Sequence, residues 1–143
     1  MKKLTLLAAM AAMALGAVAG EHDTPQKSGD YAQLAAGEAV YAGNIAAVGT
    51  NGCAYAVNTA AISGTLTVCG VFLHSAAAGE NVTVKRGGFL LDNAGNVTKK
   101  EIGATVYSVS SNAWTVTKTS GTKTVGKVAD VTADGRVVVV VGR

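Results

Sequence analysis

Seven residues near the C-terminal end have the types and order that could bind a nucleotide phosphate. The segment GTKTVGK, residues 121–127, matches the first seven positions of the P-loop pattern GxxxxGK[ST]. The eighth position requires Ser or Thr to hold magnesium, and this chain has Val128 there. A P-loop also joins a strand to a helix, whereas the residues from Lys127 to Thr132 alternate like a strand. The segment therefore predicts a turn and a strand.

Histidine and cysteine are few and widely spaced, two of each. His22 and His74 are not at ligand spacing with Cys53 or Cys69, so the sequence predicts no metal site. The patterns GxSxG, HExxH, CxxC and GxGxxG do not occur, and the nine acidic residues include no close pair within an apolar run. We therefore expect a protein that is not an enzyme, with no cofactor and no small-molecule substrate.

The two cysteines leave two interpretations open. Cys53 and Cys69 both lie in strand-like runs, where free thiols behave as small hydrophobic side chains. A disulfide between them is possible only if the protein is exported to an oxidising compartment.

The first twenty residues have the three parts of a secretory signal peptide. Lys2 and Lys3 precede an apolar stretch from Leu4 to Val18, and Ala17-Val18-Ala19 resembles a cleavage site. The alternative is a retained apolar helix, because Ala, Leu and Met occupy every face. The stretch is shorter than the ~20 residues of a transmembrane helix and is rich in alanine, so we expect no stable membrane span.

Composition indicates one small domain. The chain has 143 residues, of which 49% are hydrophobic and 15% charged, with 18 glycines and one proline. The net charge is +3, but Lys2 and Lys3 supply two of the positive charges, and the remainder is nearly neutral. A protein that binds nucleic acid needs a cluster of excess basic residues, so this class is not expected.

Short apolar or alternating runs separated by turn residues predict a mainly β fold. Asn51-Gly52 and Asp134-Gly135 are favoured two-residue hairpin loops. We expect a small β-barrel or sandwich of about eight to nine short strands. The runs are Ala39–Val48, Cys53–Val57, Leu66–Leu73, Val82–Arg86, Phe89–Leu91, Ala104–Val109, Trp114–Thr119, Thr124–Val131 and Arg136–Val141.

Two further local features are predicted. Thr98 and Glu101 have the spacing of a capping box, with Val97 and Ile102 as its hydrophobic staple, so one short helical turn is expected there. The five consecutive valines at Val137–Val141 predict a strand covered on both faces.

The chain divides into three segments. We expect residues 1–20 to form an apolar N-terminal helix, either signal-peptide-like or retained as an anchor, and residues 21–38 to form an extended arm that contains Pro25. Residues 39–143 form the β-barrel domain.

Five stretches, taken in order, resemble a family of small tailed-phage head proteins, the capsid decoration or cement proteins. The resemblance runs from Thr24 onward, which is about five-sixths of the chain, and the leader-like residues 1–20 and the two cysteines depart from the family. The stretches are TPQKSGD (24–30), AAGEAVYAGNIAAV (35–48), VTVKRGGF (82–89), VTKKEIGATVY (97–107) and WTVTKTSGTKTVGKVADVTADGRVVVVV (114–141).

The resemblance implies a compact β-barrel that binds the outside of an assembled head, commonly as a homo-trimer, and bridges subunits of the major capsid protein. It implies a virion protein assembled in the host cytoplasm, and it carries over no catalytic or ligand residues. The arm is the segment expected to reach the capsid, by adding a strand to an exposed sheet edge. The expected contact residues are Thr24, Pro25, Gln26, Lys27, Ser28, Gly29, Asp30 and Tyr31.

A second function remains open at this point. If the leader is cleaved after Ala19, the chain would be a secreted or periplasmic β-rich protein of the cell surface, adhesin-like, with a disulfide between Cys53 and Cys69.

Overall fold

The computed structural model of the chain describes residues 29–120 and 122–142. The expected apolar helix at residues 1–20 and the first part of the arm, residues 21–28, lie outside the described residues. Within the described part the protein is mainly β, as predicted, with ten strands and one short helix.

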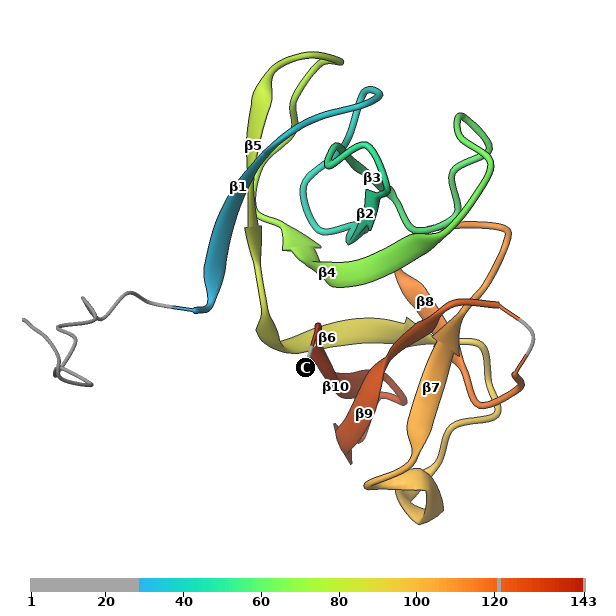
Figure 1. Ribbon diagram of the computed structural model, residues 1–143. Coiled ribbons are helices and arrows are strands. Elements are labelled where there is room, and N and C mark those ends of the chain that lie inside the picture. Colours follow the sequence, from blue (N-terminus) through green and yellow to red (C-terminus); the bar gives the residue numbers. More distant parts are fainter. Residues whose placement is uncertain (1–28, 121, 143) are drawn as a thin grey trace, which may run out of the picture.

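The first half of the described chain forms a five-stranded antiparallel sheet, seen in the upper half of Figure 1. An isolated parallel bridge between Ala36 and Ala54 joins the residue after β1 to the opposite edge strand, β3. The sheet order is β1 (Tyr31–Ala35), β5 (Asn81–Lys85), β4 (Leu66–Phe72), β2 (Ile45–Gly49) and β3 (Ala54–Ala56).

The second half forms a closed five-stranded barrel, which Figure 1 shows below the sheet. Its pairs are antiparallel except for the parallel pair of β6 and β8. Around the barrel the strands are β10 (Val137–Val141), β6 (Gly87–Asn93), β8 (Thr115–Thr117), β7 (Thr105–Ser108) and β9 (Thr124–Val131). Closure leaves the barrel without an unpaired edge strand.

Sheet and barrel are joined by one residue and by a shared core. Only Arg86 separates β5 from β6, and Figure 1 shows β5 turning directly into β6. The larger hydrophobic cluster fills the barrel and also includes Ile45, Val57 and Val71 from the first half of the chain. A smaller cluster around Phe72 lies within the sheet. The two halves therefore pack on each other through the larger core.

Most of the predicted strands are confirmed, with two corrections. The predicted strand Ala39–Val48 is wrong in its first half: the strand is Ile45–Gly49, and before it Val40 makes only an isolated bridge to Ala76. The tenth strand is β1, which forms inside the segment predicted as an arm. The two predicted hairpin turns do place their glycines at positive φ, 80° at Gly52 and 90° at Gly135.

The five valines form β10, but the prediction that both faces are covered is wrong in part. Val137, Val139 and Val141 point into the barrel and are fully buried. Val138 and Val140 point outward and remain half-buried. β10 pairs with β6 on one side and with β9 on the other, and its outward valines are only partly covered.

The predicted capping box is confirmed at the helix η1 (Lys99–Glu101). The Thr98 hydroxyl accepts a hydrogen bond from the Lys100 amide at 3.3 Å, and the Glu101 carboxylate accepts one from the Thr98 amide at 2.7 Å. The Thr98 hydroxyl also donates to the Glu101 carboxylate at 2.9 Å, and the two bonds that Glu101 accepts from the Thr98 amide and hydroxyl lower its pKa. The staple is incomplete, because Val97 is buried whereas Ile102 is 49% exposed.

The described part of the P-loop-like segment leads into a strand, as predicted. β9 begins at Thr124, and Val128 lies in the barrel core. The amide of Val128 donates to the carbonyl of Ala104, so this backbone is committed to pairing within the barrel.

Candidate partner-binding site

Strand β1 forms one edge of the first sheet, and its pairing with β5 sets which backbone groups face outward. The Arg86 amide donates to the Asp30 carbonyl at 2.7 Å, and the Ala36 amide donates to the Glu80 carbonyl at 2.8 Å. In an antiparallel pair, hydrogen-bonded and non-hydrogen-bonded residues alternate. The N–H and C=O groups of Tyr31, Gln33 and Ala35 therefore point away from β5, along the outer edge of the sheet.

The side chains of the same residues lie over β5. The ammonium of Lys85 lies 5.4 Å from the centre of the Tyr31 ring, and the side-chain amide of Gln33 donates to the Thr83 hydroxyl at 3.5 Å. Both contacts join residues directly opposite one another in the register. Close side-chain contact is typical of non-hydrogen-bonded pairs, so these contacts agree with the backbone assignment.

The chain just before β1 is fastened to the corner between sheet and barrel. The Arg86 guanidinium donates to the Gly29 carbonyl, and the Arg86 amide bonds Asp30. A hollow of about 340 Å³ lies beside these contacts, lined in part by Tyr31, Cys69 and Arg86. We call Gly29–Tyr31 with Lys85 and Arg86 the arm clamp.

Cys69 at the arm clamp is a protonated thiol. Burial raises its pKa to about 11, and a backbone hydrogen bond and the nearby Arg86 charge only partly oppose this rise. The thiol lies 3.5 Å from the Ala46 carbonyl, to which it donates. Since the thiolate is the reactive form, this cysteine is placed for packing and not for nucleophilic chemistry.

Cys69 in the folded protein is expected to react with iodoacetamide about 100-fold more slowly at pH 8 than in denaturant. The rise in pKa from 9.0 to about 11 lowers the thiolate fraction by this factor. The rate is expected to keep increasing with pH up to about 11. A Cys53→Ser variant, whose remaining thiol is Cys69, allows measurement by mass spectrometry. Equal rates in the folded and denatured protein at pH 8 would contradict this assignment.

The geometry does not suit the disulfide considered for an exported protein. Both cysteines are free. Cys53 leads into β3 and Cys69 lies in β4, and these strands flank β2 on opposite sides. Two strand spacings separate such residues by about 9–10 Å, whereas a disulfide needs Cα atoms within about 7 Å. An intramolecular bond between Cys53 and Cys69 would therefore require rearrangement of the sheet.

Five of the eight predicted contact residues lie outside the described part of the chain. They are Thr24, Pro25, Gln26, Lys27 and Ser28. The other three, Gly29, Asp30 and Tyr31, lie together in the arm clamp. The sequence analysis did not assign Lys85 and Arg86 to this site. The signal that could have found them is a pair of adjacent basic residues at the end of a predicted strand, directly before Gly87-Gly88.

His74 has a structural role in the described chain. Its Nε2 accepts a hydrogen bond from the Thr83 amide at 3.1 Å, and its Nδ1 lies 3.1 Å from the Ser75 carbonyl. A proton on Nδ1 satisfies both contacts, so the ring links the segment after β4 to β5. Among residues 29–120 and 122–142, no group of three or more His, Cys, Asp and Glu could hold a metal ion. No helix in these ranges is long and apolar enough to cross a membrane.

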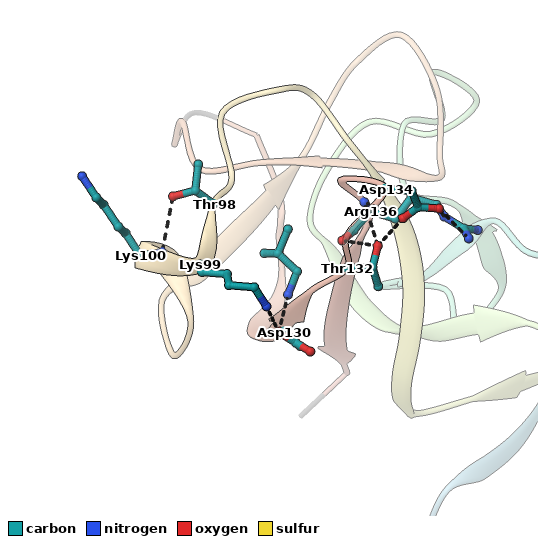
Figure 2. Close-up of polar contacts among 8 residues, drawn as sticks. Thr98, Lys99, Lys100, Asp130, Thr132, Asp134 and Arg136 are labelled. Carbon is teal, nitrogen blue, oxygen red and sulfur yellow. Dashed lines mark hydrogen bonds and ion pairs between the residues drawn. The ribbon is translucent and has the colours of Figure 1, made fainter.

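The far end of the barrel carries exposed ion pairs, shown in Figure 2. Lys99 of η1 lies 3.0 Å from Asp130 of β9, and this hydrogen-bonded contact lowers the pKa of Asp130. In the β9–β10 turn, Asp134 bonds Thr132 and lies 3.0 Å from Arg136, and these contacts lower its pKa. Because all of these charges are exposed, their contribution to stability is small.

No protein-family model matches the chain, and no curated protein matches it.

Proposed function

We propose that this protein is a non-enzymatic structural protein of a tailed-phage virion, which binds the outer surface of the assembled capsid and bridges subunits of the major capsid protein. The order of motifs along the chain supports this proposal from the sequence. The observation that carries it is the outward edge of β1, which lies within the predicted arm and presents the backbone groups of Tyr31, Gln33 and Ala35.

Such an edge suits recognition by strand addition. A capsid segment in extended conformation would pair with the outer edge of β1, and backbone hydrogen bonds would supply the affinity. The arm clamp holds the start of β1 against Arg86, so the edge is ordered before a partner arrives. An edge that is already ordered lowers the entropic cost of binding.

Decoration stabilises a shell by mass action. A protein that binds only the assembled state lowers the free energy of that state. In the trimer implied by the family resemblance, the second and third contacts become effectively intramolecular, so each contact can be weak. We place the protein on the outside of the head, assembled in the host cytoplasm, with the major capsid protein as its partner.

Replacing Gln33 with proline is expected to weaken binding to shells at least tenfold while leaving the fold intact. The backbone N–H of Gln33 points away from β5. Proline at this position therefore removes an outward donor without breaking the β1–β5 ladder. Binding is measured by co-sedimentation with shells assembled from the major capsid protein of the same phage. Circular dichroism checks that the variant is folded.

Two controls accompany this variant. Gln33→Ala keeps the amide and is expected to bind like the native protein. Leu34→Pro removes an amide that points toward β5, so it is expected to disrupt the pairing of β1 itself. Native binding by Gln33→Pro would contradict the role of the β1 edge, and failure of the native protein to bind mature shells would contradict the proposed function.

A further inference from the structure

The outer face of the barrel carries two matched rows of residues across β6, β10 and β9. In the first row, Leu90, Val138 and Asp130 lie directly opposite one another; in the second, Gly88, Val140 and Lys127 do so. Residues opposite each other on neighbouring strands project from the same face. The alternate positions on these strands, including Val137, Val139 and Leu91, are buried inside the barrel, so both rows face outward. We call these six residues the barrel face.

The barrel face is apolar in its centre and charged along β9. Leu90 is 43% exposed, and the outward valines are half-buried. Gly88 leaves an open space beside Val140, because a Cβ atom there would meet nothing within 4 Å. On the β9 side, the exposed Asp130 and Lys127 place opposite charges at the ends of the two rows.

We propose that a second copy of this chain docks on the barrel face about a two-fold axis. The axis lies between the two facing surfaces and runs across the strands, perpendicular to them. Such an axis exchanges the two rows. It places Leu90 over the open space at Gly88 of the second copy, and Val138 against Val140. It also places Asp130 opposite Lys127, and each of these contacts occurs twice, as a two-fold interface requires. The inference goes beyond the proposed function and does not depend on it.

The shape of the barrel face agrees with this arrangement. The outer surface of a closed barrel is convex, so the central strand β10 meets its counterpart first. The central strand carries the short valines, and the long side chains Leu90 and Lys127 lie on the flanking strands, where they can reach across the wider gap.

The charges are also available for the contact. Lys99 and the Val131 amide both bond Oδ1 of Asp130, as Figure 2 shows for the lysine. Within the described ranges, no other group bonds Oδ2 of Asp130, and the Lys127 ammonium forms no ion pair. Exposed charge pairs at the rim of an interface set orientation and specificity more than affinity. The arrangement therefore predicts a two-fold contact whose register depends on Lys127 and Asp130.

The area of the barrel face predicts a weak association. Stable interfaces bury about 1,200–2,000 Å² in total, and three partly exposed apolar side chains per copy supply less than that. The contact is expected to form at high protein concentration, or where copies are held side by side on a surface.

Charge exchange tests the proposal in the full-length protein. Sedimentation equilibrium of the native protein over a concentration series is expected to show a species of twice the starting mass. Lys127→Asp and Asp130→Lys are each expected to abolish the doubling, because each variant faces like charges across the axis. An equimolar mixture of the two variants is expected to restore it, since every facing pair then has opposite charges. Lys118→Asp reverses an exposed lysine outside the barrel face and is the matched control.

Three results would overturn the proposal. They are a native protein that does not double in mass up to millimolar concentration, single variants that associate like the native protein, and a mixture that fails to restore association. If the native protein does not double in mass and Leu90→Asp weakens binding to shells, the barrel face contacts the capsid instead.

Discussion

Replacing Gly126 with alanine is expected to destabilise the protein by about 3 kcal/mol or more. Gly126 is buried in β9, opposite Val141 of β10. A Cβ atom at this position would lie 1.9 Å from the carbonyl oxygen of Val140. The carbonyl belongs to β10, which pairs with β9 in the closed barrel, so it cannot turn away without breaking the β9–β10 ladder. Chemical denaturation of the native protein and the variant measures the difference in the free energy of unfolding.

Gly88→Ala is the matched control for this prediction. Gly88 lies in β6, on the other side of β10, and a Cβ atom there would meet nothing within 4 Å. The free energy of unfolding of the Gly88→Ala variant is expected to stay within about 0.5 kcal/mol of the native value, as for other open surface positions. Equal effects of the two substitutions would show that close backbone packing at Gly126 does not limit stability.

Phe72→Ala is expected to cost about 3–5 kcal/mol of stability. Among the described residues, Phe72 is the largest fully buried side chain, and it lies in the smaller hydrophobic cluster together with Val82 and Val84. Truncation to alanine leaves a cavity that the surrounding strands can close only in part. Leu73→Ala is the control, because this adjacent side chain is 44% exposed and belongs to neither cluster.

The Phe72 variant also tests whether sheet and barrel unfold together. Ile45, Val57 and Val71 place the first half of the chain in the barrel core, so one cooperative transition is expected. The midpoint of the unfolding transition of the Phe72→Ala variant is then expected to fall by the same amount with two probes. One is far-ultraviolet circular dichroism, and the other is fluorescence of Trp114, which lies beside β8 of the barrel. A loss of signal in the sheet before the barrel would contradict a shared core.

Local patterns along the chain were enough to predict most strands and the helical turn. The runs at Leu66–Leu73 and Thr124–Val131 lie within one residue of β4 and β9, because each is bounded by turn residues and carries β-branched or apolar side chains. The capping box at Thr98 and Glu101 depends only on residues three apart, so it could be read directly.

Features that depend on long-range pairing could not be predicted in this way. β1 has the pattern YAQLA and is almost wholly exposed, so no hydrophobic alternation marks it, and its pairing with β5 makes it a strand. The outward side of β10 follows from barrel closure, and five consecutive valines hide the alternation. The basic corner of the arm clamp needs residues 29 and 86 to meet, which the sequence does not indicate.

The arm clamp also determines how a mechanical load enters the molecule. The start of β1 and the end of β5 lie at the same end of their pair, since Tyr31 is opposite Lys85. A pull transmitted through residue 29 and resisted by the barrel through Arg86 would therefore peel β1 from β5 one residue pair at a time, beginning at the clamp. The hydrogen bonds between β1 and β5 would bear the load one after another, so β1 would detach at low tension while the closed barrel stays intact. Under the proposed function, a shell that swells under internal pressure would separate β1 from β5 before it disrupted the barrel.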